Sequence, residues 1–232
     1  QIQARGIIEV LRKGITDGFT DTKLHLFYDK PVSAYNAGDK ALYDANLFSV
    51  MRQVYSSPND KKSLDMVIFI NGIPVMSFEL KNELTKQNVQ HAIKQYKTDR
   101  DPNEELFRLG RLMVNFAVDT EEVWMCTHLK KDKSYFLPFN KGYNNGAGNP
   151  PNDGIKTDYL WKEILTKNNL TEIIQNYCQL ITEEKEYADA NGKITTKKEK
   201  KLIFPRYHQL YAVRSILADA QEKGSGQKYL IQ

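Results

Sequence analysis

Two apolar runs separated by Asn71-Gly72 are the feature that most constrains the fold of this chain. The runs cover residues 63–70 (SLDMVIFI) and 73–81 (IPVMSFELK). Asn-Gly is a favoured pair in two-residue hairpin turns, because both positions need a positive φ. The nearly continuous apolarity of the first run is typical of a strand that is buried on both faces. We therefore expect an antiparallel strand pair inside a sheet.

Further helix and strand patterns surround this hairpin. They predict helices over 1–14, 41–46, 83–99, 159–165, 170–180 and 207–222, and strands over 23–28, 47–55, 113–118, 122–128 and 135–139. The Gly-, Asn- and Pro-rich segment 140–153 predicts a loop. This order of elements predicts an α/β fold, more closely an α+β mixed sheet with flanking helices.

Three charged side chains lie in the otherwise apolar hairpin, namely Asp65, Glu79 and Lys81. Glu79 and Lys81 share a face of their strand, because side chains alternate along a strand. A two-residue turn would set Asp65 opposite Phe78 and away from that face. One extra residue, as in a three-residue loop with a glycine bulge, would set Asp65 directly opposite Glu79, with Cβ atoms about 5 Å apart. We expect this second register, because it is the geometry that a metal site needs.

Two carboxylates this close repel each other unless one binds a proton or a divalent cation lies between them. Mg²⁺ prefers carboxylate and carbonyl oxygens, completed by water and substrate phosphate oxygens. Such an ion activates water and stabilises the charge that develops on a phosphodiester. Lys81 beside it would orient the water and neutralise the phosphate. The simplest alternative is an ordinary ion pair of Lys81 with Asp65 or Glu79 at a strand edge.

Segment 63–82, SLDMVIFINGIPVMSFELKN, resembles the nuclease hairpin of type I restriction endonuclease R subunits, the motor-and-cleavage chains. The segments NLFSVMRQVYSS, AIKQYKTDRDP, YFLPFNKGYNNGAGNPPN and LIFPRYHQLYAVR are similar to the same family in the same order. The resemblance implies a restriction-endonuclease-like fold and a PD-(D/E)xK site formed by Asp65, Glu79 and Lys81. It implies Mg²⁺ held by Asp65, Glu79 and the Leu80 carbonyl, and cleavage of double-stranded DNA. The motif's proline is replaced by Leu64, which is a minor departure because the proline is not a ligand.

The resemblance also suggests residues outside the hairpin. Many relatives carry a QxxxY motif on the following helix; Tyr96 fits it, but Ala92 stands where the glutamine belongs, and Gln95 has another spacing. We expect Tyr96 and Arg100 to contact DNA. Some relatives add an acid from the first helix to the metal site, and Glu9 is the acid available there; a solvated helix face is the alternative.

Residues 204–209 (FPRYHQ) resemble the adenine-reading Q motif that precedes the phosphate loop of superfamily 2 helicase motors. A glutamine amide offers both a donor and an acceptor to the edge of adenine. Arg206 and Gln209 are the predicted reading residues, with Phe204 or Tyr207 for stacking. No G-x-x-x-x-G-K-[ST] phosphate loop occurs in the 232 residues. We expect ATP to bind only in a full-length chain, and these residues alone neither to hydrolyse ATP nor to translocate.

These patterns predict three parts: an endonuclease domain over 1–182, a charged linker over 183–202 with Asn191-Gly192 as a hairpin or loop tip, and the start of a helicase-like motor domain over 203–232. Both ends of the sequence suggest a fragment of a longer chain. The basic run at 197–201 is a candidate for DNA phosphates, although a solvated linker explains it more simply. The implied partners are double-stranded DNA and the methylase (M) and specificity (S) subunits. A catalytically silent scaffold that docks the motor onto the methylase core is the alternative function.

Composition agrees with this interpretation but would not have suggested it. The chain has 33 Lys and Arg against 29 Asp and Glu, a net charge of +4, so no strongly basic composition indicates nucleic acid. Cys126 and Cys178 are too few for a disulfide framework. The apolar runs are far shorter than the about 20 residues that cross a membrane. We expect a protein of the bacterial or archaeal cytoplasm with no membrane partner.

Overall fold

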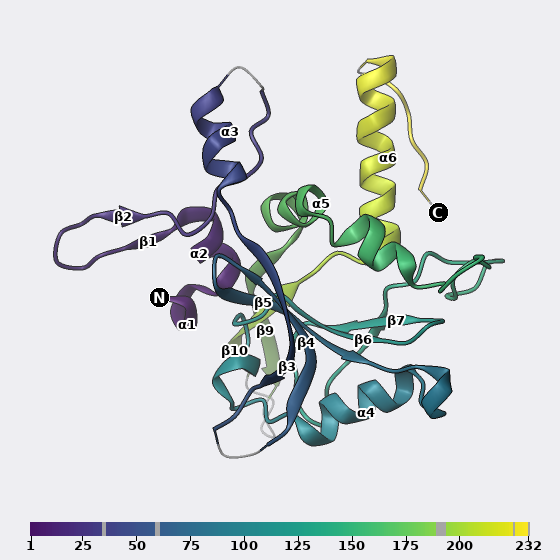
Figure 1. The fold of residues 1–232 in the computed structure, drawn as a ribbon. Coiled ribbons are helices and arrows are strands. Elements are labelled where there is room, and N and C mark those ends of the chain that lie inside the picture. Colours follow the sequence, from purple (N-terminus) through teal and green to yellow (C-terminus); the bar gives the residue numbers. More distant parts are fainter. Residues whose placement is uncertain (34–35, 59–60, 189–193, 225, 232) are drawn as a thin grey trace.

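A computed structural model describes residues 1–33, 36–58, 61–188, 194–224 and 226–231 (Figure 1). The fold is mixed α/β, as predicted, and is built on a six-stranded sheet in the order β3-β4-β5-β6-β7-β8. Strands β5 and β6 are parallel, and the other neighbouring pairs are antiparallel. The strands are β3 (Phe48–Tyr55), β4 (Ser63–Ile70), β5 (Ile73–Leu80), β6 (Val114–Val118), β7 (Val123–Cys126) and β8 (Leu137–Pro138).

Helices cover both faces of this sheet (Figure 1). The α-helices are α1 (Ile2–Arg5), α2 (Ile7–Lys13), α3 (Ala37–Asp44), α4 (Val89–Asp99), α5 (Lys167–Glu172) and α6 (Tyr207–Lys223). The 3₁₀ helices are η1 (Glu83–Thr85) and η2 (Glu105–Phe107), and the π-helices are η3 (Leu160–Ile164) and η4 (Ile173–Tyr177). Helix α4 packs on one face through Val89, Ala92, Ile93 and Tyr96, whereas α2, η3, α5 and η4 cover the other. Within the described residues, no helix combines the length and apolarity needed to cross a membrane.

The β4–β5 hairpin has the predicted register at its open end, but it reaches that register differently. Asn71 and Gly72 both have positive φ, 50° and 79°, and form a two-residue turn that pairs Ile70 with Ile73. A bulge then inserts Val75 as an extra residue on β5, because the pairing passes from Phe69–Pro74 to Ile68–Met76. The predicted extra residue is therefore present, but it is Val75 within β5 and not a residue of a three-residue loop. Pro74 has no amide hydrogen to donate to the ladder, which favours a bulge beside it.

Several predicted elements differ in extent from those observed. The first helix is two, α1 and α2, because Gly6 between them has φ 79° and a Cβ there would lie 2.7 Å from Leu180 Cδ2. The strand expected over 23–28 is only β2 (Lys23–Leu24), which pairs with β1 (Ile15–Thr16) outside the main sheet. The helix expected over 170–180 ends at Tyr177.

The segment predicted to be a charged linker forms an antiparallel hairpin of β9 (Gln179–Ala188) and β10 (Ile194–Ile203). Cross-strand ion pairs, including Lys185–Glu199 at 2.7 Å and Lys198–Glu184 at 3.1 Å, join its two strands. The expected Asn191-Gly192 tip lies outside the described residues. Beyond the hairpin, the chain returns to the core and then enters α6 (Figure 1). The division into an endonuclease and a motor part stays a prediction.

Candidate functional site

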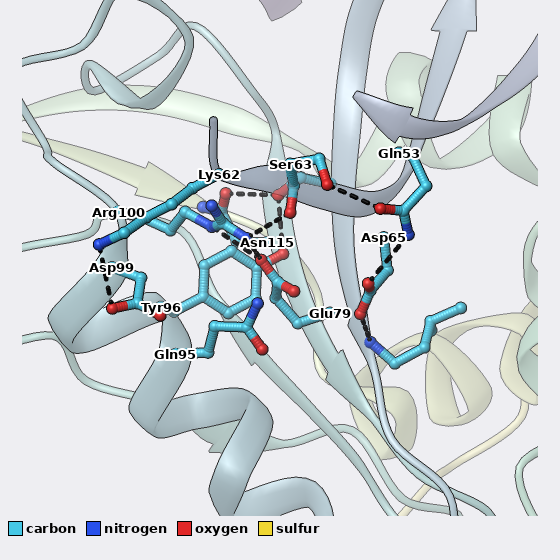
Figure 2. A network of polar contacts seen from close by, with 12 residues as sticks. Gln53, Lys62, Ser63, Asp65, Glu79, Gln95, Tyr96, Asp99, Arg100 and Asn115 are labelled. Atoms are coloured by element: carbon cyan, nitrogen blue, oxygen red, sulfur yellow. Dashed lines mark hydrogen bonds and ion pairs between the residues drawn. The ribbon is translucent and has the colours of Figure 1, made fainter. Parts of the chain in front are cut away.

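The candidate site lies where the two strands of the hairpin separate (Figure 2). The β4–β5 ladder ends at the Met66–Phe78 pair, and its register continued by one residue sets Asp65 opposite Glu79. Side-chain contacts replace the ladder there: Asp65 Oδ2 accepts a hydrogen bond from the Leu80 amide at 2.8 Å. On the other side, Gln53 interrupts the β3–β4 pairing with φ 53° and donates to Asp65 Oδ1 at 3.4 Å. Both neighbouring strands therefore orient the Asp65 carboxylate.

Glu79 is fully buried and is held by one guanidinium from the end of α4. Arg100 Nε and Nη2 both donate to Glu79 Oε1, at 2.8 and 2.5 Å, and Nη2 also donates to the Ser63 carbonyl at 2.7 Å. Glu79 Oε2 has no hydrogen-bond partner among the described residues. Burial raises the pKa of Glu79 to about 8, although the Arg100 charge opposes this rise. Arg100 thus occupies one carboxylate oxygen and leaves the other available.

Helix α4 is anchored to the sheet at both ends and in its middle. Its first amide, on Val89, donates to Asp119 Oδ2 at 2.7 Å, beside the end of β6. In the middle, the Tyr96 hydroxyl lies 2.9 Å from Ser77 Oγ, which donates to Asn115 Oδ1 at 2.8 Å. Arg100 anchors the far end. Burial raises the pKa of Tyr96 well above its ordinary value. The two residues predicted as DNA contacts, Tyr96 and Arg100, therefore lie inside the protein (Figure 2).

Lys81 follows β5, and its side chain is held by Gln95, the glutamine whose spacing does not fit the QxxxY motif. Lys81 Nζ donates to Gln95 Oε1 at 2.7 Å, and the Lys81 amide bonds to the Val118 carbonyl at 2.8 Å. Gln95 is three residues after Ala92, where the motif expects glutamine, so the two positions are neighbours on the helix surface. That i, i+3 relation is the signal that could have identified Gln95 from the sequence.

The oxygen atoms at this site suit a hard cation. Asp65, Glu79 Oε2 and the Leu80 carbonyl are the donor types that Mg²⁺ prefers, and a buried oxygen without a hydrogen bond is costly unless it gains a partner. No group of three or more His, Cys, Asp or Glu side chains suited to a metal occurs in the described part of the chain. Water and phosphate oxygens would have to complete the coordination. Glu9, on α2, instead pairs with Arg5 at the end of α1 and with Lys13 of its own helix.

The Tyr96→Phe variant tests whether the Tyr96 hydroxyl stabilises the fold or contacts DNA. We expect it to lower the free energy of unfolding by about 1 kcal/mol, because one buried hydrogen bond to Ser77 is lost while Asn115 still pairs with Ser77. DNA affinity should be unchanged. Chemical denaturation and a DNA-binding assay measure the two effects. Weaker DNA binding by a fully folded variant would show that the Tyr96 hydroxyl contacts DNA.

One family model matches more than half of the chain. It describes the type I restriction enzyme R protein N terminus, and it matches residues 8–134, which are 127 of the 232 residues. The chain belongs to this family. Asp65, Glu79, Lys81, Gln95 and Arg100 all lie within the matched residues of this R-protein N-terminal region. A search of curated proteins returned no match.

The predicted adenine-reading residues lie beyond the part matched to the R-protein family. The Phe204 ring is buried in the core, with ring centroids 5.8 Å from Phe116 and 6.1 Å from Phe139. Gln209 Oε1 accepts a hydrogen bond from the Arg206 amide at 3.1 Å and so caps the start of α6. Tyr207 packs on Tyr159. In this arrangement Phe204 is a core residue and Gln209 a helix-capping residue, and adenine reading stays a prediction.

Proposed function

We propose that this R-protein N-terminal region is a Mg²⁺-dependent endonuclease that cuts phosphodiesters of double-stranded DNA. The observation that carries the proposal is the buried, unpaired Glu79 Oε2 in a register that sets Glu79 opposite Asp65. The restriction complex would supply the methylase and specificity subunits. In a full-length chain, cleavage would be coupled to ATP-driven translocation by a motor.

The residues of the site have distinct roles in this proposal. Asp65, Glu79 and the Leu80 carbonyl would hold Mg²⁺, which supplies Lewis acidity and a more acidic bound water. Lys81 would orient the attacking water and offset the negative charge that develops on the phosphate. Gln95 holds the Lys81 ammonium at 2.7 Å, which limits the positions that this group can take. The Leu80 amide holds Asp65 in the same way.

Arg100 supports this proposal because it binds only one of the two carboxylate oxygens of Glu79. Its two donated bonds go to the same oxygen of Glu79, so the guanidinium fixes the carboxylate without covering Oε2. Its bond to the Ser63 carbonyl, two residues before Asp65, ties β4 to the same group. A single buried cation thereby sets the positions of both carboxylate-bearing strands.

Mn²⁺ binding tests this proposal without requiring the other subunits. The unaltered protein should bind Mn²⁺, monitored by electron paramagnetic resonance, and Glu79→Gln or Asp65→Asn should weaken binding by about tenfold or more, the loss expected for a missing ligand interaction of about 1.4 kcal/mol. Asp99→Asn is the matched control, because Asp99 is a nearby carboxylate that pairs with Lys62 at 3.3 Å. A protein that binds no Mn²⁺, or a Glu79→Gln variant that binds normally, would favour the scaffold function instead.

A further inference from the structure

A second feature lies away from the carboxylate pair, at the β9–β10 hairpin. A cavity of about 560 Å³ opens between this hairpin, the loop after β7 and the start of α6. Its lining includes Met125, Leu137 and Phe204, which belong to the core on the sheet face opposite α4. Ser77 and Glu79 point to the α4 side. The cavity and the carboxylate site therefore lie over different faces of the sheet.

The lining of this cavity is strongly cationic. Six basic side chains line it, Lys130, Lys133, Lys185, Lys200, Lys201 and Arg206, against two acidic ones, Glu183 and Glu199. The difference, six minus two, is +4, which equals the net charge of the whole chain. The charges of the remaining residues therefore sum to zero, and the cavity lining is a local concentration of positive charge.

Only part of this charge is compensated within the protein. Lys185 pairs with Glu199 at 2.7 Å and Lys201 with Glu183 at 3.5 Å. Among the described residues, no acidic side chain forms an ion pair with Lys130, Lys133 or Arg206. These three cations come from two separate segments of the chain, which the fold brings to the same cavity.

The chemistry of the lining indicates a ligand with several phosphates. Lysines act as mobile point charges, which suits repeated phosphate groups more than one small anion with a fixed geometry. Thr127 and Gln209 add uncharged polar groups of the kind that contact a nucleic-acid backbone, and Tyr135 beside them is 74% exposed. An open cationic lining without an enclosed apolar pocket does not favour recognition of a base.

We propose that this cavity binds the phosphodiester backbone of double-stranded DNA, without reading its sequence, as a holding site separate from the carboxylate pair. The choice of DNA as the source of the phosphates rests on the proposed function. The cationic lining of the cavity is observed independently of that function. A site of this kind would retain the duplex on the protein while a different phosphodiester is cut.

The test uses the unaltered 232-residue chain and a short labelled duplex, with EDTA present so that the metal site plays no part. We expect Lys130→Glu/Lys133→Glu to weaken duplex binding at least tenfold by fluorescence anisotropy. The slope of log affinity against log salt concentration should become less steep by about 2, because two phosphate contacts are lost. Lys23→Glu/Lys30→Glu, the same charge change at exposed lysines elsewhere, is the matched control and should retain affinity.

Three outcomes would overturn the proposal: an unaltered protein that does not bind the duplex, equal losses in the two double variants, or a cavity variant that keeps the duplex affinity of the unaltered protein. The last outcome would show that the cavity lysines do not contact the duplex. Circular dichroism and thermal melting confirm that both variants fold. Since EDTA removes the metal, a failure here leaves the Mn²⁺ result unchanged, and the two proposals can fail separately.

Discussion

Asp65→Asn, Glu79→Gln and Lys81→Ala should each lower DNA cleavage by the assembled restriction complex at least about 10³-fold, corresponding to about 4 kcal/mol of transition-state stabilisation. The two carboxylate variants remove oxygens that would hold Mg²⁺, and the lysine variant removes the cation that Gln95 positions 2.7 Å away. Cleavage of plasmid DNA and restriction of phage by the complex measure the effect. The loss should be similar for the three variants, because each group acts in the same step.

The controls for this experiment separate chemistry from assembly. ATP hydrolysis by the same complexes should continue, because none of the three residues lies in the predicted motor segment. Asp99→Asn changes a neighbouring carboxylate, whose ion pair with Lys62 is exposed, and should cleave normally. Normal restriction of phage by any one of the three site variants would show that its residue is not part of the site.

Arg100→Met should lower the free energy of unfolding by about 3–5 kcal/mol, measured by chemical denaturation in metal-free buffer. The pair Arg100–Glu79 is fully buried, at 2.5 Å, and removing the guanidinium leaves the buried Glu79 side chain without its partner, so that it must either keep an unpaired charge or take up a proton. The Ser63 carbonyl loses a donor as well. A charge without a partner is costly inside a protein, so the loss should far exceed that of a surface pair.

The double variant Arg100→Met/Glu79→Leu should recover most of that loss, because two apolar side chains of similar size leave no charge unpaired. Arg108→Met is the matched control: Arg108 pairs with Glu105 at 3.0 Å, but both side chains are more than half exposed. Its effect should stay within about 1 kcal/mol. If Arg100→Met were no more destabilising than Arg108→Met, Arg100 would not hold Glu79 in solution.

The parts of the fold that were predicted correctly depend on local patterns. Asn71-Gly72 specifies a tight turn, because these two residues tolerate positive φ, and apolar runs on both sides specify the paired strands β4 and β5. The register at Asp65 and Glu79 was also correct, although the extra residue is Val75 in the strand and not a residue of the turn. The signal for the bulge, Pro74, was present in the sequence.

Other parts of the structure are decided by contacts between segments that are distant in the sequence. The charged segment predicted as a linker pairs with itself as β9 and β10, since ion pairs across the strands satisfy its charges. Phe204 is a predicted adenine-stacking residue, and in this fold its ring lies in the core, with ring centroids 5.8 Å from Phe116 and 6.1 Å from Phe139. Adenine reading by this residue stays a prediction. A motif contains the same aromatic residue whether its ring faces a ligand or packs in the core. Only the tertiary packing distinguishes these two roles.

The sequence by itself determined the central hairpin and the mixed α/β class, because turn chemistry and strand periodicity act over a few residues. It also marked Asp65, Glu79 and Lys81 as candidate site residues. Only the tertiary structure decided the environment of those residues. Arg100 is 21 positions from Glu79 and Gln95 is 14 positions from Lys81, and each reaches its partner because α4 packs on the sheet. The free oxygen of Glu79 and the cationic cavity likewise depend on which distant side chains the fold brings together, and no local pattern records that.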